Sequence, residues 1–147
     1  MKPHRSLLFV PAADTRKVQK AFASDADCVL LDLEDAVALS EKENARRLAL
    51  EILREPHQKP VYVRVNGIDT PFLFNDLTTI IQGGPAGIML PKAESPDHIR
   101  KVDWLIGQLE RESGIPAGQT RMIPLIESGA GIIRAADIAG ASGRTRC

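Results

Sequence analysis

The chain has 147 residues, 44% of them hydrophobic, and its 19 basic residues balance 19 acidic ones. This length and composition predict one globular domain with its own core, and the charge balance gives no electrostatic basis for binding nucleic acid or an anionic membrane. No apolar run approaches the roughly 18 residues that a membrane span needs, so we expect a soluble cytoplasmic protein.

From the N-terminus onward, short runs of β-favouring apolar residues alternate with helical patterns. Asp14 is placed to cap the first predicted helix, Ser40 and Glu43 have the spacing of a capping box, and Ser95 precedes a proline that suits the first turn of a long helix. The predicted strands cover residues 6–10, 28–34, 61–65, 87–92 and 122–127. The predicted helices cover residues 14–23, 40–53, 72–82, 95–112 and 128–139.

This alternation predicts an α/β fold with parallel strands joined by right-handed crossovers. A closed (β/α)₈ TIM barrel needs roughly 250 residues, so a chain of this length holds about five βα units. We therefore expect a partial TIM barrel with strands six to eight missing. The predicted domain covers residues 1–140, and residues 141–147, which are small, polar and basic, are expected to form a frayed tail.

Polar side chains gather where the predicted strands end. The C-terminal ends of parallel strands lie at one rim of the sheet, where binding loops form, and burying an unpaired carboxylate costs several kcal/mol. Acids at the end of an apolar strand therefore indicate a cation, a basic partner or an open site. The strand-end residues are Asp32, Glu34, Asp35, Arg64, Asn66, Lys92 and Glu127.

Each of these residues also has a structural interpretation. Arg64 could neutralise Asp32 or Glu34 on the neighbouring strand, Glu127 could cap the following helix, and Lys92 could be a solvated charge at the rim. Residues 128–131, Ser-Gly-Ala-Gly, could bind a phosphate, but they lack the full spacing of a dinucleotide or P-loop motif, which favours a tight turn from strand to helix.

A carboxylate-rich rim with one guanidinium favours a particular chemistry. Hard oxygen ligands suit Mg²⁺, which takes one or two protein carboxylates and completes its shell with water and substrate oxygens. Such an ion facing an arginine would bind a carboxylate or α-keto acid and stabilise an enolate, the charge that develops when a carbon–carbon bond beside a carbonyl is made or broken.

Five segments carry a resemblance to a known family. They are RSLLFVP at 5–11, LDLEDAV at 31–37, VRVNG at 63–67, LPKAE at 90–94 and PLIES at 124–128. In order and spacing they resemble the citrate lyase beta subunit-like branch of the HpcH/HpaI aldolase family. The resemblance implies a TIM barrel, usually oligomeric, that makes or breaks carbon–carbon bonds in citryl-, malyl- or related acyl-CoA thioesters with Mg²⁺.

Carried onto this sequence, the resemblance assigns roles to the strand-end residues. Arg64 would hold the substrate carboxylate or carbonyl oxygen, while Glu34 and Asp35 would orient metal-bound water and the arginine. The implied catalytic residues are Arg64, Glu34 and Asp35, the substrate-binding residues are Arg64, Asn66 and Lys92, and the metal ligand is Glu127.

One motif of the family has no counterpart in the chain. The second metal ligand of the family is an aspartate in a Gly-x-x-Asp-Leu segment after the sixth strand, and residues 143–147 do not provide it. We therefore expect a shortened member with impaired catalysis and with exposed edges on its first and fifth strands. The expected partners are an acyl-CoA or small carboxylic acid and a second copy or another chain. The alternative is a non-catalytic fragment that assembles through the open edge.

Overall fold

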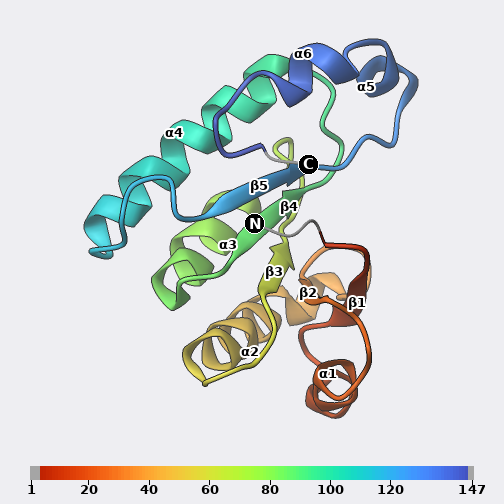
Figure 1. Cartoon of the computed structure of the whole chain (residues 1–147), viewed down its shortest axis with the longest axis vertical. Coiled ribbons are helices and arrows are strands. Elements are labelled where there is room, and N and C mark those ends of the chain that lie inside the picture. Colours follow the sequence, from red (N-terminus) through yellow and green to blue (C-terminus); the bar gives the residue numbers. More distant parts are fainter. Residues whose placement is uncertain (1–3, 146–147) are drawn as a thin grey trace.

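The computed structural model describes residues 4–145, which form a parallel sheet of five strands with helices between them (Figure 1). The strands lie side by side in the order of the sequence. A strand order that never reverses is the order found in a (β/α)₈ barrel, whereas a doubly wound sheet reverses it. The strands are β1 (Leu7–Pro11), β2 (Cys28–Asp32), β3 (Val61–Arg64), β4 (Gly87–Leu90) and β5 (Arg121–Pro124).

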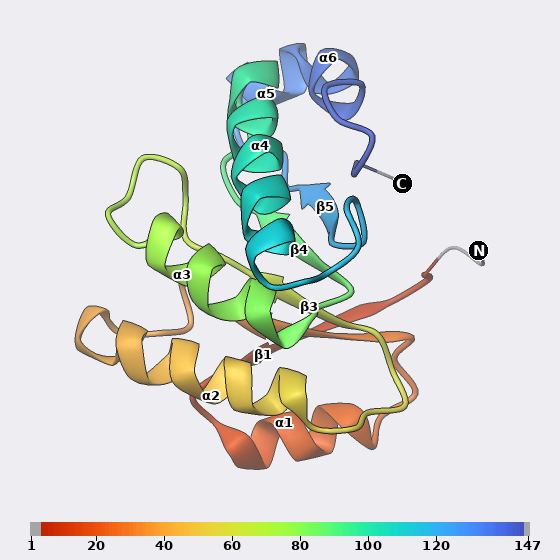
Figure 2. The same ribbon diagram turned by 90° about the vertical axis from the view of Figure 1, so that its left-hand side faces the viewer.

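Helices follow every strand, and the four longer ones, α1 to α4, lie along one face of the sheet (Figure 2). No helix among residues 4–145 combines the length and apolar character that crossing a bilayer would require. The α-helices are α1 (Thr15–Phe22), α2 (Lys42–Arg54), α3 (Leu73–Ile80), α4 (Pro96–Glu112), α5 (Gly129–Ile133) and α6 (Ala135–Ala139), and the short 3₁₀ helices are η1 (Leu39–Glu41) and η2 (Ile81–Gly83).

Two of the predicted helix starts are confirmed by their caps. The Asp14 carboxylate accepts a hydrogen bond from the Lys17 amide at 2.9 Å, at the start of α1. The Ser95 hydroxyl accepts one from the His98 amide at 3.3 Å, at the start of α4. Each bond satisfies one of the amides that the first turn of a helix leaves without a partner.

Two other expectations about the helices are wrong. The capping box expected from Ser40 and Glu43 does not form, because the 3₁₀ turn η1 precedes α2 and the residue at its N-cap, Glu41, makes no side-chain capping bond. The final helix expected to end at residue 139 is two short helices, because Arg134 adopts φ −106° and ψ 13° between α5 and α6.

The two faces of the sheet have different environments. The outer face packs against the helices and forms the main core with residues such as Val29, Leu31, Val63 and Ile88. The inner face carries a smaller apolar cluster, which consists of Cys28, Leu30, Tyr62 and Met89. Gly87 permits this packing, because a Cβ atom there would lie 2.6 Å from the Tyr62 ring. Alternation along β2 and β3 places their last residues, Asp32 and Arg64, on the inner face as well.

The expected frayed tail is not what the structure shows for residues 141–145; residues 146–147 lie outside the described part. Arg144 is only 8% exposed, and its backbone carbonyl accepts a hydrogen bond from the Met122 amide at 3.1 Å. Thr145 pairs with Met122 in an isolated parallel bridge. The basic charge is buried because Arg144 joins Asp103, Glu110 and Thr120 in a set of contacts that we call the back cluster.

Candidate active site

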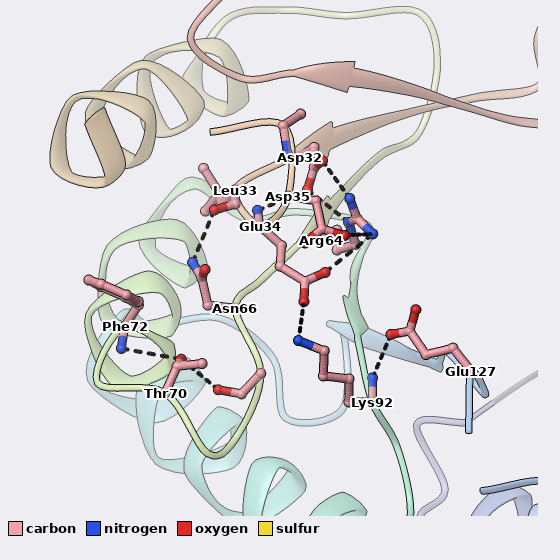
Figure 3. Close-up of polar contacts among 12 residues, drawn as sticks. Asp32, Leu33, Glu34, Asp35, Arg64, Asn66, Thr70, Phe72, Lys92 and Glu127 are labelled. Carbon is pink, nitrogen blue, oxygen red and sulfur yellow. Dashed lines mark hydrogen bonds and ion pairs between the residues drawn. The ribbon is translucent and has the colours of Figure 1, made fainter. Parts of the chain in front are cut away.

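The site is centred on Asp32 and Arg64, a register pair that ends β2 and β3. Arg64 Nε donates to Asp32 Oδ1 at 2.8 Å, and Nη2 donates to Oδ2 at 2.6 Å (Figure 3). Burial acts to raise the pKa of Asp32, but the hydrogen bonds from Arg64 and from backbone amides outweigh it and lower that pKa below its usual value. The interpretation of Arg64 as the partner of a neighbouring acid is confirmed.

The third nitrogen of Arg64, Nη1, faces two more acids. It lies 3.2 Å from Glu34 Oε2 and 3.5 Å from Asp35 Oδ2. The ring of Phe9 on β1 lies 5.0 Å from Arg64 Cζ, within the range of a cation–π contact. Among the described residues, the hydrogen bonds of this guanidinium use Nε and Nη2 and leave Nη1 without one. We call Asp32, Glu34, Asp35, Arg64 and Lys92 the rim cluster.

Glu34 is a buried acid whose carboxylate is incompletely satisfied. Its Oε1 lies 3.4 Å from Lys92 Nζ, and its Oε2 accepts no hydrogen bond within residues 4–145. Burial raises the pKa of Glu34 and the charge of Asp35 raises it further, while Arg64 and Lys92 lower it by less. A carboxyl group with a raised pKa at the rim of a site holds a proton more readily than an ordinary glutamate.

Lys92 follows β4 and links two strand ends. Its side chain approaches Glu34, and its backbone amide donates to Glu127 Oε1 at 2.9 Å (Figure 3). Its φ of 51° is the only positive value at a non-glycine residue within residues 4–145. Backbone held in this region is strained, and such strain concentrates at functional sites. The side chain is 54% exposed, so Lys92 is both a rim charge and a partner of Glu34.

The segment after β5 forms a tight turn, as its composition favours. The Ser128 hydroxyl caps α5 by accepting a hydrogen bond from the Gly131 amide at 3.2 Å, so Glu127 is not the capping residue. A Cβ atom at Gly131 would lie 2.8 Å from the Ala93 carbonyl, which explains a glycine at this position. The exposed carboxylate of Glu127 therefore remains available at the rim.

Asn66 lies below the rim. It is 3% exposed, and its amide nitrogen donates to the Leu33 carbonyl at 3.1 Å and to Asp76 Oδ2 at 2.6 Å. Strand alternation predicts that Asn66 lies on the same face as Arg64. This does not hold, because β3 ends at Arg64 and Asn66 is outside the strand. Asp76, on α3, also forms an ion pair with Arg46 at 3.0 Å. Asn66 therefore supports the rim from beneath, and its amide nitrogen is not open to a substrate.

Sequence reasoning missed three residues of this region: Phe9, Lys42 and Asp76. Phe9 belongs to an apolar strand, whose composition predicts burial. Its ring is 45% exposed and contacts Arg64 because it lies on the open inner face of the sheet. Lys42 and Asp76 belong to amphipathic helices, in which a charged residue normally faces water. Both are buried instead, and no local pattern in the sequence indicates this.

The residues present fit part of a magnesium site. Within residues 4–145 no group of three or more His, Cys, Asp or Glu side chains is placed to hold a metal ion. The Glu34 Oε2 atom has no hydrogen-bond partner in the described chain, and the Glu127 side chain is exposed at the rim. Protein-bound Mg²⁺ often uses only one or two carboxylates, because water and substrate oxygens fill the remaining positions.

Comparison with protein families gives a match over nearly the whole chain. The model described as HpcH/HpaI aldolase/citrate lyase matches residues 5–147. The citrate lyase subunit beta of Leuconostoc mesenteroides is 40% identical over 142 residues, which are 95% of this chain and 47% of that protein. An L-malyl-CoA/beta-methylmalyl-CoA lyase of Cereibacter sphaeroides is 37% identical over 97% of this chain and 46% of that protein. The chain spans about half the length of the curated relatives it matches.

Comparison with solved structures agrees with the family match. The citrate lyase beta subunit of Mycobacterium tuberculosis, solved in complex with oxaloacetate and magnesium, is similar to this chain with a TM-score of 0.70 and 34% identity. The match covers 92% of this chain and 53% of that one. The prediction of a partial TIM barrel is therefore confirmed.

Proposed function

The chain belongs to the HpcH/HpaI aldolase/citrate lyase family, and on this premise we propose that it acts in a magnesium-dependent carbon–carbon lyase reaction. The proposed substrate is a small hydroxy acid or its CoA thioester, of the citryl-CoA or malyl-CoA type. The observation that carries the proposal is the guanidinium of Arg64, which is fixed on one side by Asp32 and has Nη1 free of hydrogen bonds in the described chain.

Arg64 would bind the anionic part of the substrate. The bidentate bond to Asp32 fixes the plane of the guanidinium, so Nη1 is already oriented when a carboxylate or carbonyl oxygen replaces its ion-pair contacts with Glu34 and Asp35. A preorganised donor stabilises negative charge that develops on that oxygen as the enolate forms. The contact with Phe9 limits rotation of the guanidinium further.

Three charged neighbours of Arg64, namely Glu34, Asp35 and Lys92, would influence how it binds the substrate. Glu34 and Asp35 attract Nη1 from the rim side, and the raised pKa of Glu34 suits it to hold or release a proton close to the reacting group. Lys92 would contribute a second cation toward an anionic substrate. Asn66 would act indirectly, because its amide nitrogen is committed to Leu33 and Asp76.

Glu127 is the residue that would hold the ion, and Glu34 would orient water bound to it. Mg²⁺, when bound, supplies positive charge that stabilises the enolate oxygen. The contribution of the chain is to present Glu127, whose Oε1 is oriented by the Lys92 amide, and Glu34, whose Oε2 lacks a hydrogen bond among the described residues.

The proposal is tested by assaying the purified chain with Mg²⁺ and an acyl-CoA substrate such as malyl-CoA. Arg64→Lys keeps a positive charge beside Asp32 but loses the planar fork, and we expect turnover to fall about 100-fold. Arg100→Lys is the matched control, because Arg100 is exposed and pairs only with Asp97 on its own helix in the described structure. Absence of turnover in the unmodified chain, or an equal loss in both variants, would contradict the proposal.

A second candidate function is assembly through the edge of the sheet. Strand β1 is at one edge of the described sheet, and Leu8 and Phe9 on it are 39% and 45% exposed. Exposed apolar edge strands favour pairing with another chain. Light scattering distinguishes the candidates when read beside the assay: a stable oligomer without turnover supports assembly alone, and turnover lost in Arg64→Lys supports the lyase.

A further inference from the structure

The backbone of residues 33–36, which we call the acidic turn, is held from above by one side chain. The Asp32 carboxylate accepts the Glu34 amide on Oδ1 at 2.9 Å and the Ala36 amide on Oδ2 at 3.2 Å. The same two oxygens bind Arg64. Asp32 therefore couples the shape of the acidic turn to the position of the guanidinium.

The same turn is held from below by Lys42, the first residue of α2. Lys42 Nζ donates to the Leu33 carbonyl at 2.7 Å and to the Glu34 carbonyl at 2.6 Å. Asn66 donates a further bond to the Leu33 carbonyl. Hydrogen bonds to its amides on one side and to its carbonyls on the other leave the turn little freedom. The Cα–Cβ bond of Glu34 therefore leaves the turn in a fixed direction.

Burying Lys42 is costly, and packing does not require it. The residue is 6% exposed, and Nζ lies 5.8 Å from the centre of the Phe72 ring. Burial lowers the pKa of Lys42, while nearby acids, Asp76 first among them, raise it by less. An apolar residue of similar volume would fill such a position without this desolvation cost. A buried ammonium at this position therefore indicates a function that depends on its hydrogen bonds.

We propose that Lys42 is a positioning residue that aims the Glu34 carboxylate toward Arg64 and Lys92 by fixing the carbonyls of the acidic turn. Its effect on catalysis rests on the proposed lyase function. Its effect on the acidic turn does not, so the two can be tested separately.

Amide hydrogen exchange tests the effect on the turn. Lys42→Met keeps an unbranched side chain out to the ε position and removes the ammonium, and we expect the Glu34 and Ala36 amides to exchange at least about tenfold faster than in the unmodified chain. The matched control is Arg144→Met, which removes a buried cation far from the rim. There the amides of Gly118 and Thr120, which donate to Glu110, should show the largest local increase in exchange, and Glu34 and Ala36 should change no more than amides that exchange through global unfolding.

Two outcomes of the exchange experiment would overturn the proposal. One is unchanged exchange at Glu34 and Ala36 in Lys42→Met. The other is a general effect: either the variant fails to fold, or exchange at Gly118 and Thr120 accelerates as much as exchange at Glu34 and Ala36. Lys42→Arg retains the charge and can donate to both carbonyls, so it should recover most of the protection at Glu34 and Ala36.

Kinetics test the effect on catalysis. A misplacement of about 1 Å can cost about 100-fold in rate, so Lys42→Met should lower kcat about 100-fold with little change in KM, and Arg144→Met should leave kcat unchanged. If the unmodified chain turns over substrate and Lys42→Met has the same kcat, the proposed effect of Lys42 on catalysis is wrong. If the unmodified chain shows no turnover, the lyase proposal fails, and the exchange result still decides the role of Lys42.

Discussion

Two of the arginines that the chain buries against acids, Arg64 and Arg144, lie in clusters whose hydrogen bonds are satisfied to different degrees. In the back cluster every nitrogen of Arg144 donates: Nε to Asp103, Nη1 to Glu110 and the Thr120 carbonyl, and Nη2 to Glu110. In the rim cluster Arg64 is equally buried, with 12% of its side chain exposed against 8% for Arg144. Its Nη1 nevertheless has only ion-pair contacts among the described residues.

Two buried glutamates show the same contrast. Burial acts to raise the pKa of Glu110, but hydrogen bonds from Arg144 and from two backbone amides lower it to about 2. For Glu34 burial prevails, and its pKa is raised. A cluster with every hydrogen bond made stabilises the fold. In the rim cluster Arg64 Nη1 and Glu34 Oε2 meet in an ion pair at 3.2 Å without a hydrogen bond, and a ligand can replace that contact. This difference separates the rim cluster from the back cluster.

The largest expected effect is a loss of stability when the back cluster is broken. Arg144→Met leaves Glu110 buried without its cation, which should lower the free energy of unfolding by about 4 kcal/mol, because breaking a buried pair leaves an uncompensated charge. Urea unfolding measures this loss. The folded fraction of the variant should retain the kcat of the unmodified chain, and a parallel loss of kcat would remove the distinction between the clusters.

The pH dependence of stability should come from Glu110. A lowered pKa stabilises the fold above the unfolded value of 4.5, and this contribution is lost as the pH falls toward the folded value of about 2. Over that window the stability difference between the unmodified chain and Glu110→Gln should shrink by about 3 kcal/mol, because the glutamine does not titrate. Urea unfolding across this range provides the comparison, and a difference independent of pH would contradict it.

At the rim, Glu127→Gln should weaken magnesium binding without unfolding the chain. The glutamine keeps an oxygen that can accept the Lys92 amide, but it loses the negative charge. We expect the affinity for Mg²⁺, measured by calorimetry, to fall about tenfold. Glu112→Gln, on an exposed helix end, is the control and should leave the affinity unchanged. Equal affinities in all three proteins would exclude Glu127 as a ligand.

The smallest effect concerns backbone strain at Lys92. Lys92→Gly and Lys92→Met both remove the ammonium, but only glycine adopts a φ of 51° without cost. The glycine variant should therefore be more stable than the methionine variant by about 1 kcal/mol, with similar turnover in both. Thermal unfolding measures the difference. Equal stabilities would show that the positive φ carries no strain.

Much of the fold follows from local patterns in the sequence. The strands, the caps at Asp14 and Ser95 and the parallel alternation are local properties, and the structure confirms them. The convergence of Asp32, Glu34 and Arg64 follows from strand ends meeting at one rim. Their bond pattern does not, because it depends on the register of β2 and β3.

The remaining features depend on contacts between distant segments. Lys42 and Arg144 are separated from their partners by turns and helices, and a charged residue in either position gives no local sign of burial. Alternation also fails where a strand ends, which is why Asn66 lies below the rim. Sequence reasoning therefore found the charged groups of the site and missed the groups that hold them.

Among the described residues, Arg64 keeps one guanidinium nitrogen, Nη1, without a hydrogen bond, whereas every guanidinium nitrogen of Arg144 donates one. The most direct test is a ¹⁵N–¹H spectrum of the arginine side chains during titration with a small α-keto acid in the presence of Mg²⁺. The account predicts saturable shifts of the Arg64 resonances with the Arg144 resonances unchanged. An Arg64 signal that does not respond, or equal responses from both arginines, would contradict it.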